Sequence, residues 1–248
     1  KNFLCNLALY NSQYFRQLAI ISTSPVVTEQ LRGISHKLSV FDSVGNYKRS
    51  KKHISFGDYE YFVVTLNRLE VQNYLLQIGA NVLVVEADAT WFSSFVFEHV
   101  ANLLKLHDFV SANDDYTRTR PLISAGFLAS RSTEHSRKFF NEYTNLYRRE
   151  LMRQSSSGRR IDLPGEQEYM TTLLRQNVYN CSLAWLDKCN FVSGQWYSNQ
   201  HIRETCQSPW VIQNNWIVGS ERKVFRAQEN RHWFLNKQEV CGISVSGF

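Results

Sequence analysis

The chain has 248 residues, 43% of them hydrophobic and 14% aromatic, and it carries a formal net charge of +6. This composition excludes a disordered or low-complexity protein, and the length suffices for one large domain with a full core. The positive charge favours anionic ligands in general. The basic run at 48–53 is interpreted as a solvated loop, because no recognition helix, RNA platform or zinc finger accompanies it. We therefore expect no nucleic-acid partner.

Hydrophobic periodicity predicts alternating helices and strands in the first third of the chain. A helix is expected at 1–14, strands at 18–22 and 38–41, a short helix at 28–33 between them, and a loop at 45–57. The order of strand, helix and strand is typical of an α/β protein.

The middle of the chain continues this alternation. Helices are predicted at 58–78 and 92–106, and strands at 82–85, 109–112 and 123–129. The first of these helices should end at Gly79, because glycine suits the left-handed residue that follows a helix.

The last part of the chain begins with a long helix, capped by Ser132 or Thr133, and a loop at 155–160 leads to a further helix at 165–176. The remainder is aromatic and irregular, with two short strands. Because no internal repeat or linker composition divides the chain, we predict a single domain over residues 1–248. Its expected architecture is a Rossmann-type α/β fold with a mostly parallel central sheet flanked by helices.

Two carboxylates, Glu86 and Asp88, directly follow the buried strand at 82–85. In open α/β sheets, ligands bind outside the carboxyl ends of the strands. An acidic pair at that place can hold a hard divalent cation, and the cation can neutralise a diphosphate. The alternative is a solvated turn, since acidic pairs are common after buried strands.

The five cysteines show no CxxC or Cys/His ligand spacing, which argues against a zinc site. Four of them lie in the last third of the chain and could form two disulfides, as would fit a secretory lumen. They are Cys181, Cys189, Cys206 and Cys241. The chain starts at Lys1 without a signal-peptide pattern or membrane anchor. We expect membrane contact only through an anchor absent from this chain.

Four motifs, taken in their order and spacing, carry a resemblance to a known family. They are LLQIGANVLVVEADATW at 75–91, AGFLASR at 125–131, Glu166-Gln167, and QNNWIVGSERK at 213–223. Together they resemble the nucleotide-diphospho-sugar transferase family, related to rhamnogalacturonan xylosyltransferases and retaining α-galactosyltransferases. The similarity covers roughly residues 47–233. It implies a GT-A-like fold and transfer of a sugar from a nucleotide-diphosphate donor to a glycan or glycoprotein hydroxyl.

The resemblance further implies that the transfer depends on Mn²⁺ or Mg²⁺ and retains the anomeric configuration. In the family the acidic-x-acidic motif binds the metal, which maps to Glu86 and Asp88. Gln213 stands where a metal-ligating His is usual. Glu166 and Gln167 match the pair that faces the reacting sugar and are the candidate catalytic residues. The family also implies a Golgi or secretory-pathway lumen, as the ectodomain of a type II membrane protein.

The resemblance assigns the donor itself to residues near the end of the chain. Lys223 is expected to contact the diphosphate, and Asn215 and Gly219 belong to the same motif. Gly126 is placed with them, because a glycine inside a predicted strand often marks the close approach of a ligand.

Three departures from the family pattern keep a second hypothesis open. Glu86 and Glu166 each replace an Asp, and Gln213 replaces the His with a neutral amide, which is a poorer ligand for a transition metal. The second hypothesis is therefore a catalytically weak or silent relative that binds sugar nucleotides or glycans. A third is a metal-dependent nuclease or phosphohydrolase that uses the acidic pair with Asp114 and Asp115, although no pattern places the ligands of a second metal. The donor base, the sugar, the acceptor and the linkage stay open.

Overall fold

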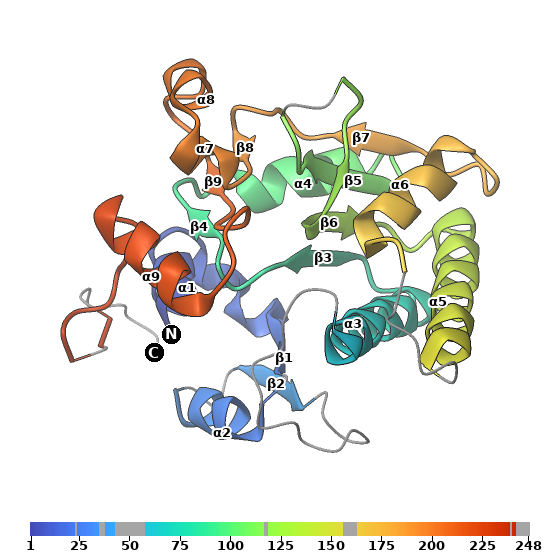
Figure 1. Ribbon diagram of the computed structural model, residues 1–248, viewed down its shortest axis with the longest axis horizontal. Helices are drawn as coiled ribbons and strands as arrows, with labels where there is room; N and C mark the ends of the chain where they lie inside the picture. Colours follow the sequence, from blue (N-terminus) through green and yellow to red (C-terminus); the bar gives the residue numbers. More distant parts are fainter. Residues whose placement is uncertain are drawn as a thin grey trace. The chain divides into compact units, whose positions relative to one another are not determined.

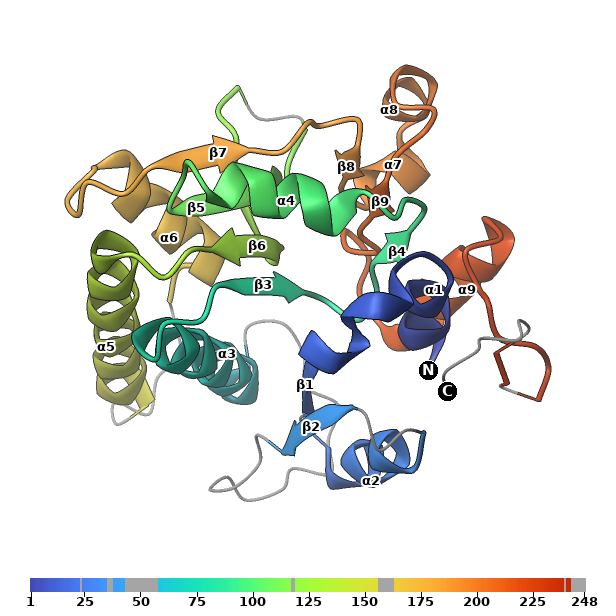
Figure 2. The ribbon, with the colours of Figure 1, turned by 180° about the vertical axis from the view of Figure 1, so that it is seen from behind.

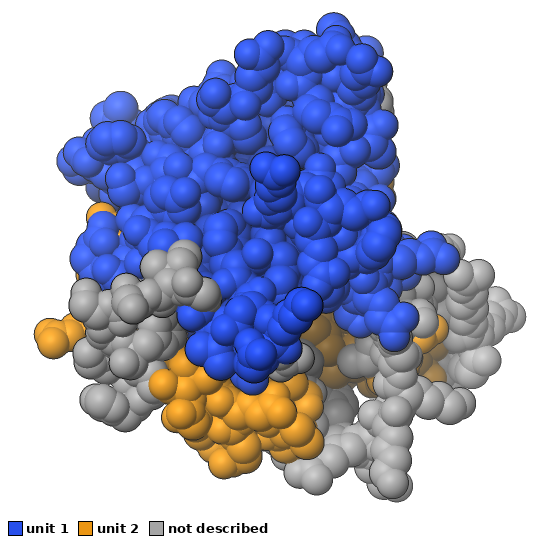
Figure 3. All heavy atoms as spheres, turned by 90° about the vertical axis from the view of Figure 1, so that its left-hand side faces the viewer, with its two compact units in different colours: residues 1–13, 83–131, 182–248 blue, residues 14–82, 132–181 orange. Residues whose placement is uncertain are grey.

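The computed structural model describes residues 1–22, 24–34, 38–42, 58–116, 119–155, 163–238 and 240–241. The whole predicted loop at 45–57, with the basic run at 48–53 inside it, lies outside these residues, as do residues 156–160 of the loop at 155–160. The chain divides into two compact units, shown in different colours in Figure 3. Unit 1 comprises residues 1–13, 83–131 and 182–248, and unit 2 comprises residues 14–82 and 132–181. The single domain over 1–248 stays a prediction.

The larger sheet has four strands. In spatial order they are β3 (Val82–Val85), β6 (Ile123–Ser130), β5 (Phe109–Asn113) and β7 (Leu183–Trp185). β5 runs antiparallel to β6 and parallel to β7. The antiparallel pair follows from its short connection, since the described residues between 114 and 122 form no helix that could carry the chain back to the start of a parallel strand. The predicted α/β class is confirmed, with strand directions that are mixed.

A smaller sheet of three short strands continues unit 1. Its order is β4 (Thr90–Trp91), β9 (Val211–Ile212) and β8 (Phe191–Val192), with β4 antiparallel and β8 parallel to β9. All six residues are buried. The helix predicted at 92–106 begins later than expected, as α4 (Val96–Leu104), because the Phe92 N–H still bonds across to the Trp210 carbonyl at 2.8 Å, directly after β4. Figure 1 shows β4 and β9 near one end of the larger sheet.

The helices of unit 1 come from the start, the middle and the last part of the chain. They are α1 (Asn2–Asn11), α4, α7 (Gln195–Ser198), α8 (Gln200–Thr205) and α9 (Ser220–Glu229). α1 is tied to β4 by a buried reciprocal pair, in which Asn6 Nδ2 donates to the Trp91 carbonyl at 2.8 Å and the Trp91 N–H donates to Asn6 Oδ1 at 2.6 Å. α9 was predicted to be irregular. That prediction is wrong. Only three of the ten side chains of α9 are apolar, and of these only Ala227 is buried, so the segment carries a weak signal for a buried helix.

Unit 2 holds a two-stranded parallel sheet, β1 (Ala19–Ser22) with β2 (Ser39–Asp42), and the helix α2 (Pro25–Ile34) that connects its strands. A 3₁₀ helix (Ser12–Gln17) leads from α1 into β1. The other helices of this unit are α3 (Tyr59–Gln77), α5 (Glu134–Ser155) and α6 (Glu166–Arg175). α3 and α5 lie side by side, as Figures 1 and 2 show.

Local signals at the helix ends of unit 2 are confirmed. Gly79 follows α3 with φ +92°, the left-handed conformation predicted for it. Thr133 caps α5: the Ser136 N–H donates to Thr133 Oγ1 at 3.2 Å, and the Thr133 N–H donates to Ser136 Oγ at 3.0 Å. This reciprocal arrangement is a capping box with serine in the place of Glu or Gln.

Two disulfides are present, and both lie in unit 1. They join Cys189 to Cys206 and Cys5 to Cys241. We expected the four late cysteines to supply both bonds. This is right for Cys189–Cys206 and wrong for the second bond, which uses Cys5. Cys241 pairs with a cysteine 236 positions away in the sequence, and Cys181 belongs to neither disulfide. Within the described residues, no helix has the length and apolar character that crossing a membrane requires.

Candidate functional site

The predicted metal and donor residues all lie in unit 1. Glu86 immediately follows β3, and its backbone N–H donates to the Gly126 carbonyl of β6 at 3.0 Å. A Cβ atom on Gly126 would come within 2.9 Å of Gln213 Oε1 and 3.0 Å of Glu86 Cδ. A glycine is needed here because the side chains of Glu86 and Gln213 meet over its Cα. The sequence marked Gly126 as a point of close approach, and the structure shows which groups approach it.

Gln213 is buried, with 2% of its surface exposed. Its Oε1 accepts a hydrogen bond from Ser124 Oγ at 2.8 Å. Its Nε2 has no hydrogen-bond partner within the described part of the chain. Since buried polar groups are nearly always hydrogen-bonded, this amide is poised to receive an acceptor from a ligand.

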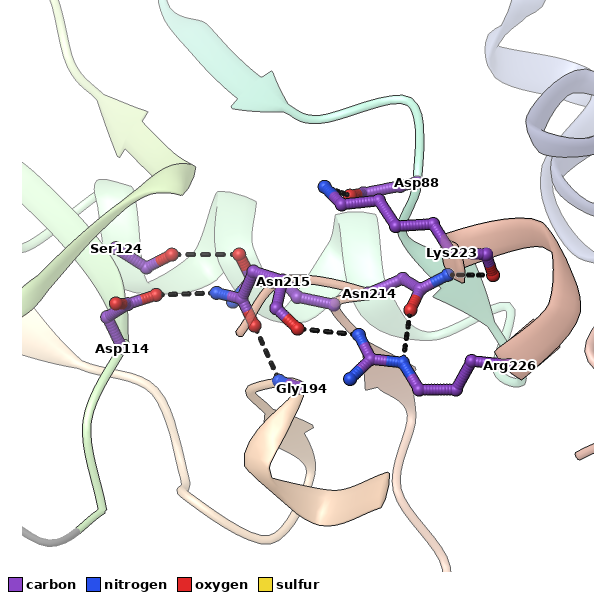
Figure 4. A network of polar contacts seen from close by, with 9 residues as sticks. Asp88, Asp114, Ser124, Gly194, Asn214, Asn215, Lys223 and Arg226 are labelled. Carbon is purple, nitrogen blue, oxygen red and sulfur yellow. Dashed lines mark hydrogen bonds and ion pairs between the residues drawn. The ribbon is translucent and has the colours of Figure 1, made fainter. Parts of the chain in front are cut away.

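Asp88 and Lys223 form an ion pair in which Lys223 Nζ donates to Asp88 Oδ2 at 2.5 Å (Figure 4). The other carboxylate oxygen, Asp88 Oδ1, is buried and accepts no hydrogen bond from any described residue. Lys223 is carried by α9, whose N-terminal flank is Gly219 with φ +100°. The positive φ lets the chain turn into α9. Glycine adopts this conformation without the steric strain that a Cβ atom would cause.

Asn215 is held by three other segments of unit 1. Its Nδ2 donates to Asp114 Oδ1 at 2.7 Å, and its Oδ1 accepts from the Gly194 N–H at 2.5 Å. Its carbonyl accepts from Arg226 Nη2 at 2.5 Å. Both polar ends of the Asn215 side chain are thus bonded within the protein, which fixes the loop between β9 and α9.

Arg226 and Asn214 belong to this network and were missed by the sequence reasoning. Arg226 Nε donates to Asn214 Oδ1 at 2.7 Å, and Asn214 Nδ2 donates to the Lys223 carbonyl at 2.9 Å (Figure 4). The guanidinium also lies over the Tyr197 ring, 4.5 Å from its centroid. Burial lowers the pKa of Arg226, although nearby Tyr197 and Asp88 oppose that shift. Predicting α9 would have revealed Arg226, which lies three residues after Lys223 and so on a neighbouring position of the helix.

Glu166 and Gln167 lie in unit 2, at the start of α6. Glu166 is 6% exposed, pairs with Arg68 of α3 through Oε1, and has no hydrogen-bond partner at Oε2 among the described residues. Its backbone carbonyl accepts from Tyr143 Oη at 2.7 Å. Gln167 is half-buried. Glu166 is therefore a buried, charge-paired carboxylate rather than a solvated residue of a first helical turn.

The chemistry of the acidic pair fits a hard divalent cation. No group of three or more His, Cys, Asp or Glu that could hold a metal occurs among the described residues. Glu86 and Asp88 nevertheless supply carboxylate oxygens, and Mg²⁺ is commonly bound by one or two carboxylates together with substrate phosphates. The buried Asp88 Oδ1, which has no hydrogen-bond donor in the described part of the chain, is the observation that fits such an ion best.

Asp114 and Asp115 do not extend this acidic pair. Asp114 accepts from Asn215, and Asp115 Oδ1 accepts from Gln195 Nε2 at 3.2 Å. Both aspartates are buried and their carboxylates hold neighbouring loops. The nuclease hypothesis therefore gains no support, because the described residues place no second set of ligands.

Comparison with known proteins settles the family. The model of the nucleotide-diphospho-sugar transferase family matches residues 30–227. The chain belongs to this family. The resemblance stated from the four motifs is confirmed.

Two curated proteins are similar to this chain. The chain is 23% identical over 237 residues to a UDP-galactose:fucoside alpha-3-galactosyltransferase of Dictyostelium discoideum, covering 92% of this chain and 36% of that protein. It is 23% identical over 205 residues to a UDP-D-xylose:L-fucose alpha-1,3-D-xylosyltransferase of Arabidopsis thaliana, covering 75% of this chain and 53% of that protein. The chain thus spans 36% and 53% of the lengths of these relatives.

Solved structures of glycosyltransferases are also similar to this chain. The galactosyltransferase LgtC, in complex with donor and acceptor sugar analogues, matches with a TM-score of 0.49 and 13% identity, covering 92% of this chain and 91% of LgtC. Mouse xyloside xylosyltransferase 1 matches with a TM-score of 0.42 and 11% identity, covering 87% and 93% of the two chains.

Proposed function

We propose that this protein is a metal-dependent, retaining glycosyltransferase that moves a sugar from a nucleotide-diphosphate donor to a hydroxyl of a glycan or glycoprotein. The observation that carries the proposal is the group formed by Glu86, Asp88 and Lys223 where β3 ends. It combines oxygen ligands for a hard cation with an ammonium that can pair with a phosphate. A bound cation and an ammonium can together neutralise the negative charge of a departing diphosphate.

The names of the two relatives narrow the proposal. Both name a UDP-sugar as donor and a fucose residue as acceptor, and both name a linkage to position 3. We propose UDP-galactose or UDP-xylose as the donor, a fucose residue as the acceptor, and an α-1,3 linkage as the product.

The residues of unit 1 would act on the diphosphate. Glu86 and Asp88 would hold Mn²⁺ or Mg²⁺, with Gln213 beside them as a third ligand or as a hydrogen-bond donor through its buried Nε2. The ion would supply a Lewis acid that neutralises charge on the departing diphosphate. When the donor binds, Lys223 would pair with a phosphate oxygen instead of Asp88 and would stabilise the same negative charge. Asn215 and Gly219 would hold the loop that carries Lys223.

The transfer itself exchanges two bonds at the anomeric carbon. The bond from that carbon to the diphosphate oxygen breaks with its electron pair, and a bond to the acceptor oxygen forms. The acceptor's proton passes to the departing phosphate oxygen, on the same face of the sugar. This route retains the configuration and requires no separate carboxylate base, consistent with the engagement of Asp114 and Asp115 in loop contacts.

Glu166 is proposed as the carboxylate that steadies positive charge at the anomeric carbon or acts as a transient nucleophile, with Gln167 beside it. Its Oε1 pairs with the Arg68 guanidinium, and its buried Oε2 has no hydrogen bond within the described chain. A charged oxygen that the protein leaves without a donor is suited to face a cationic centre.

A silent, binding-only relative is the second candidate, and Gln213 favours it, because the family's metal-ligating His is replaced by a neutral amide. Release of free sugar from UDP-galactose or UDP-xylose without an acceptor would separate the two, since transferases commonly leak such hydrolysis. Thermal-shift measurements would report donor binding in either case, with a stabilisation of about 2.7 kcal/mol expected at a donor concentration of about 100 Kd.

The test of the proposal is transfer to methyl α-L-fucoside. UDP-galactose and UDP-xylose are supplied separately with Mn²⁺, with Mg²⁺ and with EDTA, and the product is analysed by NMR. An α-1,3-linked disaccharide that forms only with a divalent ion supports every part of the proposal. A β linkage in the product would contradict the retaining mechanism. Full activity in the presence of EDTA would contradict the proposed dependence on a metal ion.

The compartment proposed for the protein is the Golgi or another secretory-pathway lumen. The two disulfides support it, because disulfides persist in oxidising compartments and are rare in the cytosol.

A further inference from the structure

Trp216 presents an apolar aromatic surface whose single polar atom is already bonded. The residue is 51% exposed, and its indole Nε1 donates to the Asp114 carbonyl at 3.0 Å. What remains accessible is therefore carbon surface of the ring. An indole held in this way offers a fixed apolar surface rather than a hydrogen-bonding group.

The backbone of Trp216 is held in an unusual conformation. Its φ is +58°, in the left-handed region that bulky side chains rarely adopt. The preceding residue, Asn215, is bonded to Asp114, Gly194 and Arg226 at once. Side chains and backbone from three other segments thus fix the loop in the conformation that turns the indole outward. Such conformations persist where the surrounding structure over-determines them, often at ligand sites.

Trp216 belongs to the loop that carries the proposed donor residues, between Gln213 and Lys223. Its indole is anchored at Asp114, and Figure 4 shows Asp114 and the Asp88–Lys223 pair at opposite ends of the polar network. Trp216 thus shares a loop with Lys223, but its indole is anchored at the Asp114 end of the network, away from the Asp88–Lys223 pair. This is the place where a second substrate would meet the donor.

We propose that Trp216 is an acceptor subsite that stacks against a pyranose ring. This inference rests on the proposed function and adds the residue that recognises the acceptor. A pyranose has a face of C–H groups and a rim of hydroxyls. The electron-rich face of an indole attracts the C–H groups by dispersion and quadrupole interactions, and the hydroxyls stay free for reaction and solvent. A nucleobase could also stack on indole, but it would tie Trp216 to the donor.

The experiment compares Trp216→Ala and Trp216→Phe with wild type. Steady-state transfer to methyl α-L-fucoside gives separate KM values for acceptor and donor, and acceptor-free hydrolysis of the UDP-sugar reports the donor site alone. Trp216→Ala should raise the acceptor KM by about tenfold, which corresponds to about 1.4 kcal/mol. Trp216→Phe should recover most of that loss, because it keeps an aromatic face. The donor KM and the hydrolysis rate should stay within about twofold of wild type, well below 1.4 kcal/mol.

Phe225→Ala is the matched control, since Phe225 is another exposed aromatic of unit 1, 60% exposed on α9. Its acceptor KM should match wild type. An equal loss in Phe225→Ala and Trp216→Ala would overturn the proposal, because any exposed apolar side chain would then have the same effect. A parallel rise in donor KM for Trp216→Ala would also overturn it and would reassign the indole to the nucleotide. Thermal melting of each variant checks that the fold is intact.

A binding measurement separates failure of this inference from failure of the proposed function. Saturation-transfer NMR detects methyl α-L-fucoside on wild type and on Trp216→Phe whether or not transfer occurs. Binding that is lost in Trp216→Ala and kept in Trp216→Phe supports the subsite even if the protein proves catalytically silent. If the fucoside binds equally to wild type and Trp216→Ala, or to neither, the subsite is wrong, even where transfer activity confirms the enzyme.

Discussion

Asp88 is the residue on which the metal proposal depends most. Its Oδ1 is buried and accepts no hydrogen bond from the described residues, and its Oδ2 forms an ion pair with Lys223. Asp88→Asn keeps the shape of the side chain and removes the charge, so Mn²⁺-dependent binding of a UDP-sugar should be lost while the fold survives. If Asp88 were only a structural residue, the change would lower stability by about 1 kcal/mol and leave Mn²⁺-dependent binding intact. Calorimetric titration of UDP with and without Mn²⁺ distinguishes these outcomes.

Gln213 tests whether the family's metal site is weakened in this protein. Its Oε1 accepts from Ser124, and its Nε2 is an unused donor among the described groups. Gln213→His introduces the family's ligand, and we expect it to tighten Mn²⁺ binding, measured by electron paramagnetic resonance of the free ion. Ser124→Ala serves as the control, because it removes the partner of Gln213 without adding a ligand. Equal Mn²⁺ affinity for wild type and Gln213→His would mean that Gln213 does not face the metal.

Glu166 is expected to act in the chemical step. Glu166→Gln removes its charge, and turnover should fall by about 100-fold, the loss typical of one electrostatic contact to a transition state, while donor affinity changes little. The structure adds a complication, because the substitution leaves Arg68 beside a neutral amide. Glu166→Asp is the matched control, since it keeps the charge and restores the family's residue. A Glu166→Gln variant that folds normally and retains near wild-type turnover would contradict the assignment.

At the scale of elements, the donor site depends on how the loop from β9 to α9 packs on α7. A Cβ atom on Gly194 would lie 2.0 Å from the Asn215 carbonyl oxygen. This oxygen belongs to the backbone, so it cannot move aside as the end of a flexible side chain could. Gly194→Ala must therefore displace the loop and should destabilise the fold by about 1–3 kcal/mol, as overpacking does. Donor affinity should fall with it, because the same loop leads to Lys223.

The control for Gly194→Ala is Gly33→Ala, in α2. A Cβ atom there would meet no atom of the described residues within 4 Å, and the residue is helical. This change should stabilise the protein by about 0.5–1 kcal/mol, since glycine is the weaker helix former. Urea unfolding of both variants gives the comparison. Similar stabilities for the two would show that the loop moves away from Gly194 without cost.

At the scale of the whole molecule, the two disulfides should differ in their contributions. The Cys5–Cys241 bond spans 236 positions and the Cys189–Cys206 bond spans 17. In the chain-entropy account a longer closed loop stabilises more, which gives about 5 kcal/mol for the first bond and about 3 kcal/mol for the second. Urea unfolding of the Cys5→Ser/Cys241→Ser and Cys189→Ser/Cys206→Ser variants measures both. A larger loss from the shorter loop would contradict that account.

The sequence by itself determined what depends on neighbours along the chain. The strand at 82–85, the end of α3 at Gly79 and the Thr133 cap follow from local hydrophobic pattern and local hydrogen bonding. The motifs were sufficient to predict the family, because their order and spacing are properties of the sequence. The position of Glu86 and Asp88 at the end of a strand follows for the same reason.

Only the tertiary structure decided which distant groups meet. The Cys5–Cys241 bond, the meeting of Glu86 with Gln213 over Gly126, and the Lys223–Asp88 pair each join residues far apart in sequence. α9 was missed because its burial is slight and its position is fixed by polar contacts of Arg226 rather than by an apolar stripe. Such contacts depend on the packing of the surrounding elements, since a hydrogen bond or ion pair between distant residues leaves no periodicity in either segment that makes it.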